Sequence, residues 1–475
     1  MSGRNGRTTN NSGNGARPNR NARAENKNSS SGKPKQARHS GKTGDRKTGA
    51  PQGRPARKPV PGLATRRAAV DILGKVVHSR RMLAAEFDTE HGNNFYRELA
   101  ANDRALVRAI VGVALHHRGQ IAEMLTRLLD RPIPEKTDRV EDILHVAIVE
   151  ILFLDVAGHA AVSLAVDEAS AERKAQPYKG LINAVLHRLI REREAFLAPQ
   201  DAVRLNALDW LFARWSAAYG EETARAIAAA HMAEPGLDIT LKPAEDAAAW
   251  AEKLGATVLP TGSLRIAEAG RVEDLAGFET GAWWVQDAAA ALPTQLLGDV
   301  AGLNVADLCA TPGGKTAQLA AAGAKVTAVD ISPNRLKRVS QNMERLGLSM
   351  EVRTADLGVW EQGETFDSIL LDAPCSATGT ARCHPDMPWS EREADIVTLS
   401  EIQARFLRRA LGWLKPGGVM VYCTCSLEPE GGERQIEALL TDVPSVERVP
   451  IAADEITELD GLVTPAGDLR TLPCH

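Results

Sequence analysis

The sequence has no segment suited to a membrane. No apolar stretch of the kind that begins a secretory signal follows Met1, and no run of about 18 or more apolar residues occurs anywhere in the 475 residues. We therefore expect a cytoplasmic protein that does not associate with membranes.

Cysteine is absent from the first 308 residues, and the six cysteines lie in the last third of the chain. They are Cys309, Cys375, Cys383, Cys423, Cys425 and Cys474. Three of them lie in or beside strand-like runs, which is unlike a disulfide framework. A CxC pair followed elsewhere by Cys-His lacks the paired CxxC spacing of structural zinc sites, so we expect no metal site.

The first 60 residues contain few acidic and few large apolar side chains. They hold fifteen Lys and Arg against Glu25 and Asp45, and so carry +13, which leaves −17 for the rest of the chain. Such a segment cannot bury enough apolar surface to offset the entropy of ordering, so we expect residues 1–60 to be a disordered basic tail. Its charge suits sequence-independent phosphate contacts, although a solubilising role explains it equally well.

The remaining chain is too long for one typical domain and changes its pattern twice. Residues 63–197 show apolar side chains at helical spacing, with Asp138 and Glu141 placed as a capping box, and predict an all-α bundle. Residues 200–300 mix helical and short strand-like segments and predict a small α+β connector. In residues 301–475 strands alternate with helices, which predicts an α/β domain with a parallel sheet.

A glycine turn follows the first strand of this α/β domain, in the segment ADLCATPGGKT (306–316). Glycine lets the backbone approach a ligand closely, but the spacing is not that of a Walker A loop. Asp330 ends the second predicted strand, where a carboxylate can accept both ribose hydroxyls, and Asp356 ends the third, where it is placed to meet an adenine amino group. Acidic strand ends repel phosphate and favour a cationic nucleoside such as S-adenosylmethionine, although each carboxylate alone could simply cap a helix.

Two cysteine motifs follow the next two predicted strands, LLDAPCSATGT (370–380) and VYCTCSLEP (421–429). Neighbouring strand ends would place Cys375 and Cys425 around one substrate. Carbon 5 of cytosine is a poor nucleophile, so a thiolate must first add to carbon 6 before a methyl group can be accepted. A free thiol is mostly protonated at neutral pH, so it needs nearby activating groups, for which Lys315 is a candidate. Asp372 is placed to stabilise the base as the thiolate adds.

These segments resemble the RNA cytosine-C5 methyltransferases, specifically the Sun/RsmB-type enzymes of small-subunit ribosomal RNA. ADLCATPGGKT, DAPCSATGT, RCHPDMPW and YCTCSLEPE match the family's motifs, and two N-terminal segments, residues 94–112 and 178–194, look like parts of a NusB domain. The resemblance implies a multidomain protein with an all-α NusB-like bundle, a small α+β connector and an α/β Rossmann-like class I methyltransferase domain. It also implies an RNA-binding bundle, a ribosomal RNA substrate, S-adenosylmethionine as cofactor and a monomer.

The resemblance also implies roles for individual residues. Cys425 would attack the base, Cys375 would assist release of the methylated RNA, and Asp372 and Lys315 would contact the base. Spacing alone does not choose between Cys423 and Cys425, and it is the TCS match that selects Cys425. The implied methyl-donor pocket consists of Asp307, Cys309, Ala310, Thr311, Pro312, Gly313, Gly314, Lys315, Asp330, Arg335, Asp356 and Asp372. On its own, a buried Cys309 is more typical of packing than of catalysis.

Two features depart from the family pattern. Thr311 occupies a position where alanine is common, a small change that should preserve the turn. The sequence ends at LRTLPCH475, where the family continues into a last strand beside the fifth. We expect the strand that precedes Cys425 to be exposed at an edge, and this chain to be less stable than a relative with that strand.

Two other functions remain open from the sequence. An RNA-binding assembly or antitermination factor could be built on the helical bundle with an inactive appended domain, although the intact cysteines argue against it. The same chemistry could also act on transfer RNA.

Overall fold

The structure is a computed structural model that describes residues 60–475 apart from 135–136, 244, 362, 453–454 and 456–458. The expected basic tail, residues 1–60, therefore lies outside the described residues except for Val60. None of the described helices combines the length and the apolar character that crossing a bilayer requires.

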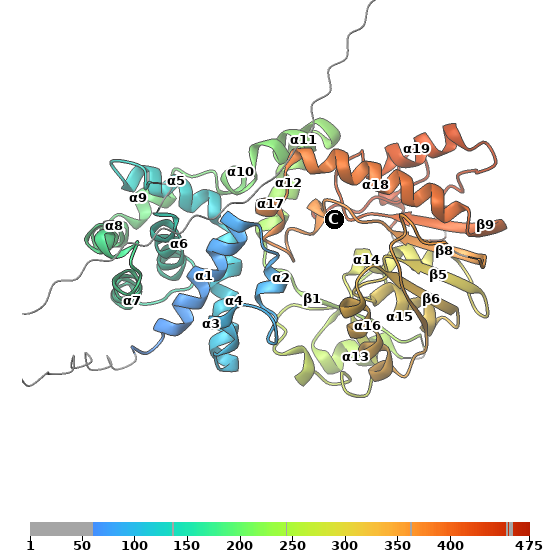
Figure 1. Cartoon of the computed structure of the whole chain (residues 1–475), viewed down its shortest axis with the longest axis horizontal. Helices are drawn as coiled ribbons and strands as arrows, with labels where there is room; N and C mark the ends of the chain where they lie inside the picture. The colour runs from blue at the N-terminus through green and yellow to red at the C-terminus, as the bar shows by residue number, and fades with distance from the viewer. Residues whose placement is uncertain (1–59, 135–136, 244, 362, 453–454, 456–458) are drawn as a thin grey trace, which may run out of the picture. The chain divides into compact units, whose positions relative to one another are not determined.

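Helices make up the described chain as far as residue 200 (Figure 1). They are α1 (Leu63–Ser79), α2 (Leu83–Glu86), α3 (Asn94–Arg97), α4 (Ala101–His116), α5 (Arg118–Leu128), α6 (Asp138–Leu152), α7 (Gly158–Ala171), η2 (Gln176–Tyr178), α8 (Lys179–Arg191) and α9 (Arg193–Leu197). The expected all-α bundle is confirmed. One apolar cluster extends from Ala68 to Phe196, and α6 is buried along nearly its whole length.

The capping box expected at the start of α6 is wrong. Asp138 is already the first helical residue, and the preceding Thr137 makes no side-chain capping hydrogen bond. Asp138 and Glu141 still lie in the first turn, where negative charge interacts favourably with the helix dipole.

Residues 202–285 contain three more helices followed by a small antiparallel sheet. The helices are α10 (Ala202–Asn206), α11 (Asp209–Tyr219) and α12 (Glu221–Met232). The sheet has the order β2-β3-β1-β4, formed by β1 (Leu237–Leu241), β2 (Thr257–Val258), β3 (Leu264–Ile266) and β4 (Trp283–Val285), with α13 (Ala247–Leu254) and η3 (Val272–Asp274) in the connections. Trp283 and Trp284 of β4 are buried and pack in apolar clusters.

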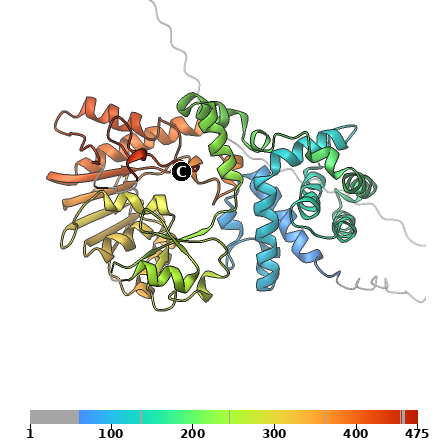
Figure 2. The same cartoon turned by 180° about the vertical axis from the view of Figure 1, so that it is seen from behind.

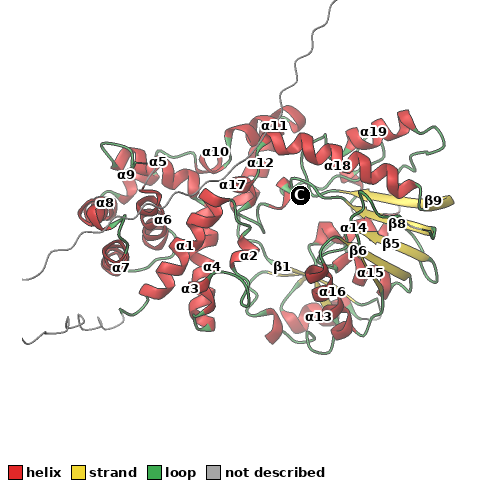
Figure 3. Ribbon diagram, viewed as in Figure 1, coloured by secondary structure: helices red, strands yellow, loops and turns green. Residues whose placement is uncertain are grey.

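The α/β segment forms a second, five-stranded parallel sheet in the order β7-β6-β5-β8-β9 (Figure 3). Its strands are β5 (Asn304–Leu308), β6 (Lys325–Asp330), β7 (Glu351–Thr354), β8 (Phe366–Asp372) and β9 (Leu414–Cys423). The helices around it are α14 (Ala288–Gln295), α15 (Gly314–Ala321), α16 (Pro333–Leu346), α17 (Met387–Ser390), α18 (Glu393–Leu411) and α19 (Glu433–Asp442), with η4 (Thr378–Thr380) and η6 (Asp460–Leu462) in loops.

Alternating side chains of the central strands pack against helices on opposite faces of this sheet. Leu308 and Leu371 join a cluster with Leu407 of α18, whereas Val305 joins a cluster with Leu319 of α15. Figure 2 shows this sheet and the helices on its two faces from behind. A sheet covered on both faces is accessible mainly at its strand ends, so the ends of β5, β6, β8 and β9 are where a ligand can reach it.

Strand β9 is the outer strand on its side of the five-stranded sheet. This agrees with the expected edge position of the strand that precedes Cys425. The expected effect on stability stays a prediction.

Candidate active site at the carboxyl ends of the parallel strands

The turn after β5 is built by unusual backbone conformations. Cys309 has a φ of 64°, which is uncommon for a residue with a side chain, and the next residue, Ala310, donates its N–H to the Val329 carbonyl at 3.0 Å. Gly313 has a φ of 105°, and a Cβ there would lie 2.6 Å from Cγ1 of Val339. Only glycine therefore fits at this position, and it sets where α15 begins.

Asp330 ends β6 with its carboxylate held by the neighbouring turn and helix. Its Oδ2 accepts a hydrogen bond from Thr311 Oγ1 at 2.5 Å, and its Oδ1 accepts from Ser332 N at 2.8 Å and from Arg335 Nη2 at 2.9 Å. Thr311, which departs from the family pattern, thus supplies a bond that alanine cannot. Pro312 lies exposed on the same turn.

Asp307 lies beneath this turn and is fully buried on β5. Its Oδ2 accepts from Thr316 Oγ1 at 2.5 Å, while its Oδ1 has no hydrogen-bond partner within the described part of the chain. Burial raises the pKa of Asp307 to about 7, and the negative charges of Asp372 and Asp330 add to the rise. A bound cation would relieve this repulsion.

Lys315 on α15 connects this acidic end to the end of β8. Its Nζ donates to Asp372 Oδ2 at 2.8 Å. Burial disfavours the ammonium, but the charge and the hydrogen bond of Asp372 outweigh it, so the net effect raises the pKa of Lys315. Lys315 therefore stays charged across the physiological pH range.

The two thiols singled out by the motifs meet at the strand ends. Cys375 follows β8, Cys425 follows β9, and their Sγ atoms lie 3.3 Å apart, within hydrogen-bond distance for sulfur. The strands themselves pair in register, with Asp372 opposite Cys423. Parallel pairing of β8 with β9 thus brings together two residues 50 positions apart in the sequence.

The contact between the sulfurs couples their ionisation. The hydrogen bond from Cys425 lowers the pKa of Cys375 to about 7, against the opposing effect of burial, and the same contact raises the pKa of Cys425. Two thiols that share one hydrogen bond lose the first proton readily and the second with difficulty. The pair therefore holds one negative charge near neutral pH, on whichever sulfur gives up the shared proton.

Cys423 and Cys425 have different surroundings in the structure. Cys423 is the last residue of β9 and packs against an apolar cluster, and burial raises the pKa of its thiol. Cys309 is half-buried against a second apolar cluster, and burial raises its pKa too. Of Cys423 and Cys425, the two candidates for the attacking thiol, only Cys425 lies within hydrogen-bond distance of a second thiol.

Asp356 is the one expected donor-site carboxylate that the structure leaves at the surface. It lies two residues beyond β7, is exposed, and accepts the N–H of Gly358 at 2.8 Å. Contact of Asp356 with an adenine group stays a prediction.

Sequence reasoning missed a buried carboxylate that joins the two cysteine loops. Glu428 accepts hydrogen bonds from Ser376, Thr378 and Ser426, the first and last of which directly follow the two cysteines. The CSLEPE motif gives no hint of this contact, because the hydroxyl partners of Glu428 come mostly from the other loop.

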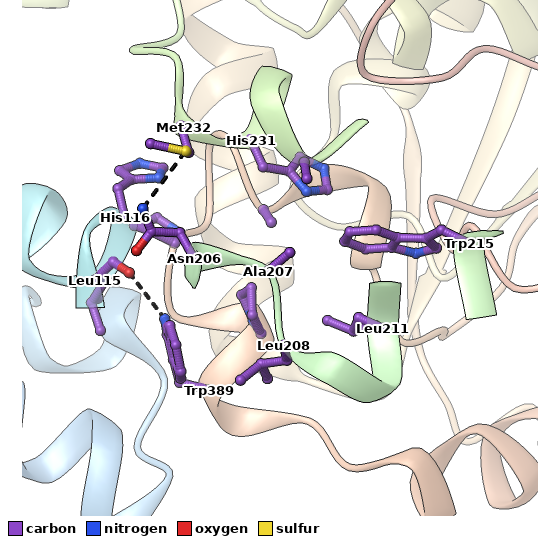
Figure 4. Close-up of a pocket in the computed structure, with 14 residues that line it drawn as sticks. Leu115, His116, Asn206, Ala207, Leu208, Leu211, Trp215, His231, Met232 and Trp389 are labelled. Atoms are coloured by element: carbon purple, nitrogen blue, oxygen red, sulfur yellow. Dashed lines mark hydrogen bonds between the residues drawn. The ribbon is translucent and has the colours of Figure 1, made fainter. Parts of the chain in front are cut away.

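The loop that continues from Cys375 is anchored on the helical bundle. Asp386 Oδ2 accepts the N–H of Leu83 at 2.8 Å, and Trp389 Nε1 donates to the Leu115 carbonyl at 3.1 Å. Trp389 and Leu115 line a cavity of about 30 Å³ with His116 and Asn206 (Figure 4). That volume suits about one water molecule, so the cavity is a packing feature and not a nucleotide site.

The five-stranded parallel sheet, its glycine turn and the acidic strand ends define a Rossmann-like class I methyltransferase fold, joined here to a NusB-type helical domain. The crystal structure of PH0851 shares the fold with a TM-score of 0.68 and 23% identity, over 88% of this chain and 96% of that one. Residues 295–475 match the family described as 16S rRNA methyltransferase RsmB/F, and residues 63–191 match the NusB family.

Curated relatives agree with these matches. Ribosomal RNA small subunit methyltransferase B of Klebsiella pneumoniae subsp. pneumoniae is 36% identical over 365 residues, which are 74% of this chain and 84% of the relative. The protein of that name from Sodalis glossinidius is 36% identical over 362 residues, 73% of this chain and 83% of the relative. The chain belongs to the RsmB/F family of 16S rRNA methyltransferases.

The methyl donor of this methyltransferase is S-adenosylmethionine, and the strand ends suit it. Its sulfonium and amino groups are positive, and the buried Asp307 carboxylate has one oxygen without a hydrogen-bond partner among the described residues. Asp330 at the end of β6 would hold the ribose, and the backbone around Gly313 and Gly314 would allow close approach. The bound donor supplies an electrophilic methyl group.

Proposed function

We propose that the protein methylates carbon 5 of a cytosine in small-subunit ribosomal RNA through a covalent cysteine–cytosine intermediate. The observation that carries this proposal is the pair of thiols 3.3 Å apart beside the Lys315–Asp372 ion pair. The names of the curated relatives support ribosomal RNA as the substrate, in preference to transfer RNA.

The first step is addition of the Cys425 sulfur to carbon 6 of the base. The thiol pair provides the negative charge, and Cys375 holds the shared proton while Cys425 attacks. Electron density then moves through the ring, which makes carbon 5 nucleophilic enough to accept a methyl group. Asp372 can accept a hydrogen bond from the amino group of the base, and the Lys315 ammonium beside it can offset the negative charge that develops on the ring.

The second step regenerates the free enzyme. Once carbon 5 carries the methyl group, a base removes its remaining proton, the carbon–sulfur bond breaks, and its electron pair returns to Cys425. Cys375 is the proposed base, because the sulfur atoms lie close together and carbons 5 and 6 are adjacent in the ring. Cys375 loses its proton to solvent before this step, when the sulfur of Cys425 is bound to carbon and carries no charge.

The proposed division of labour places RNA binding on the bundle of residues 63–197 and catalysis on residues 301–475, with residues 200–300 as connector. The separate apolar cluster of the bundle supports its limits, whereas other clusters join residues of the connector to residues of the catalytic segment. The connector also reaches the active site, since Tyr219 of α11 donates a hydrogen bond to the Leu427 carbonyl. Packing of the connector against the loop of Cys425 supports joint positioning of that loop.

Two cysteine variants test the mechanism with labelled S-adenosylmethionine and small-subunit ribosomal RNA. Cys425→Ala should reduce methyl transfer more than about a thousandfold, because the attacking atom is gone. Cys375→Ala should accumulate a covalent protein–RNA adduct that survives denaturing electrophoresis. Cys423→Ala is the matched control and should retain activity. Full activity without adduct in both of the first two variants would refute the mechanism, and the opposite pattern would exchange their roles.

A further inference from the structure

Glu428 is buried next to the active-site thiols although no proposed chemical step uses it. It is 2% exposed, and one oxygen, Oε2, accepts three hydroxyl hydrogen bonds. The donors are Ser376 Oγ at 2.7 Å, Thr378 Oγ1 at 2.7 Å and Ser426 Oγ at 2.6 Å. Burying a carboxylate is costly unless it is hydrogen-bonded. These bonds offset that cost at Oε2, while Oε1 has no hydrogen-bond partner among the described residues.

The three hydroxyls come from the two loops that carry the thiols. Ser376 directly follows Cys375 and Ser426 directly follows Cys425, and their own Oγ atoms lie 2.5 Å apart. Each cysteine is therefore one residue from a serine bound to the same carboxylate oxygen. Glu428 belongs to the loop of Cys425 and binds two hydroxyls of the loop of Cys375.

Backbone contacts continue the connection between the loops. Gly379 donates its N–H to the Cys425 carbonyl at 2.9 Å, and Leu427 donates its N–H to Thr378 Oγ1 at 3.0 Å. A Cβ on Gly379 would lie only 2.8 Å from the Cys425 carbonyl oxygen, so the approach is close. The loops are thus fixed to each other at several points around the thiols, and Glu428 is the only charged group in this set of contacts.

We propose that Glu428 is a positioning residue that holds the loops of Cys375 and Cys425 together, so that the two sulfurs stay within hydrogen-bond distance. This inference rests on the proposed function, in which both thiols act on one base. Without the carboxylate the serine hydroxyls have no common acceptor, and neutral contacts such as those of Gly379 and Leu427 still join the loops. The two sulfurs then move out of hydrogen-bond distance, and each thiol ionises on its own.

The pH dependence of thiol alkylation tests this directly, with the full chain and without RNA or methyl donor. Peptide mass spectrometry after treatment with iodoacetamide follows Cys375 and Cys425 separately. In the wild-type protein the pair should react with a midpoint near pH 7, since the pKa of Cys375 is about 7. In Glu428→Met, which keeps the length but has no strong acceptor, the midpoint should move toward that of a free thiol, about 8.5.

The groups that surround the sulfurs stay the same in this comparison. They are the Lys315–Asp372 ion pair and the hydroxyls of Thr424 and Tyr422. Loss of the negative charge of Glu428 would by itself lower the midpoint, so a rise of the midpoint reports the loop contacts. Glu428→Gln keeps a carbonyl acceptor and should restore most of the wild-type profile. Glu430→Gln is the matched control, since Glu430 pairs with Arg214 and Arg434 and contacts none of the three hydroxyls.

Ser376→Ala keeps the test decisive if Glu428→Met does not fold. It removes one hydroxyl and should shift the midpoint in the same direction by a smaller amount. Single-turnover adduct formation should fall by about a hundredfold in Glu428→Met with an unchanged dissociation constant for S-adenosylmethionine. An unchanged alkylation profile in either variant overturns the inference. Failure of the proposed mechanism is a separate result, since it would appear as activity in Cys425→Ala.

Discussion

The two halves of the active site are held together in different ways. On the donor side, at the ends of β5 and β6, Asp307 and Asp330 are bonded by Thr316 and Thr311, which are at most 19 residues away in the sequence. On the thiol side, at the ends of β8 and β9, Cys375 and Cys425 contact each other across 50 residues. The donor side is built by two strands, β5 and β6, that follow each other in the sequence with α15 between them, and the thiol side by two loops that meet only in the folded chain.

The two halves also differ in charge. The donor side collects buried carboxylates, which favour a cation, whereas the thiol side shares one negative charge between two sulfurs. Lys315 on α15 belongs to the first half by sequence but binds Asp372 of the second. If the two halves act independently, a substitution on the donor side should weaken binding of the methyl donor and leave the reactivity of the thiols unchanged.

Among these substitutions, Asp330→Ala should have the largest effect, and this effect should be on binding of the methyl donor. Loss of a carboxylate that would bind the ribose hydroxyls should weaken S-adenosylmethionine binding by about 10- to 100-fold, as expected for hydrogen bonds to a charged group. Calorimetric titration measures this, and iodoacetamide alkylation of Cys375 and Cys425 should be unchanged. Asp274→Ala, at an exposed position of the connector, is the control. A parallel change in thiol reactivity would show that the halves are coupled.

Gly313→Ala should have the second-largest effect, which should be a loss of stability of the folded protein. The φ of 105° disfavours a side chain, and the new Cβ would lie 2.6 Å from Val339, so we expect a loss of about 1–3 kcal/mol in the free energy of unfolding. Gly347→Ala is the matched control, because Gly347 also has a positive φ, 63°, but a Cβ there meets open space. Urea unfolding of both variants separates the steric cost from the backbone cost, and equal losses would contradict the clash.

The same contrast explains what the sequence could predict. The turn of Gly313 and the carboxylate of Asp330 lie in one local pattern, and the structure places them as that pattern indicates. The meeting of Cys375 and Cys425 followed from the expected neighbouring strands. The contact between Glu428 and Ser376 could not be predicted, because a buried carboxylate is recognised by its tertiary partners. Strand β4 was missed because it has only three residues, too few to show an alternating pattern.

Asp307 on the donor side offers a test that depends on pH. Its pKa is about 7 in the folded protein, because burial and the charges of Asp372 and Asp330 outweigh Thr316 and Lys315, against about 3.9 in an unfolded chain. Between these values the folded state binds the extra proton, so Asp307 lowers stability progressively as pH rises from about 4 to 7.

Asp307→Asn removes that titration and keeps an oxygen that can accept from Thr316. We therefore expect the variant to gain on the order of 1–3 kcal/mol relative to wild type between pH 5 and pH 8, measured by urea unfolding at both values. Asp367→Asn is the control, because Lys415 and the Asn304 N–H lower the pKa of Asp367, so its titration lies below this window. A difference between Asp307→Asn and wild type that stays constant with pH would mean that Asp307 is ionised throughout, and that the donor side tolerates its buried charges without a cation.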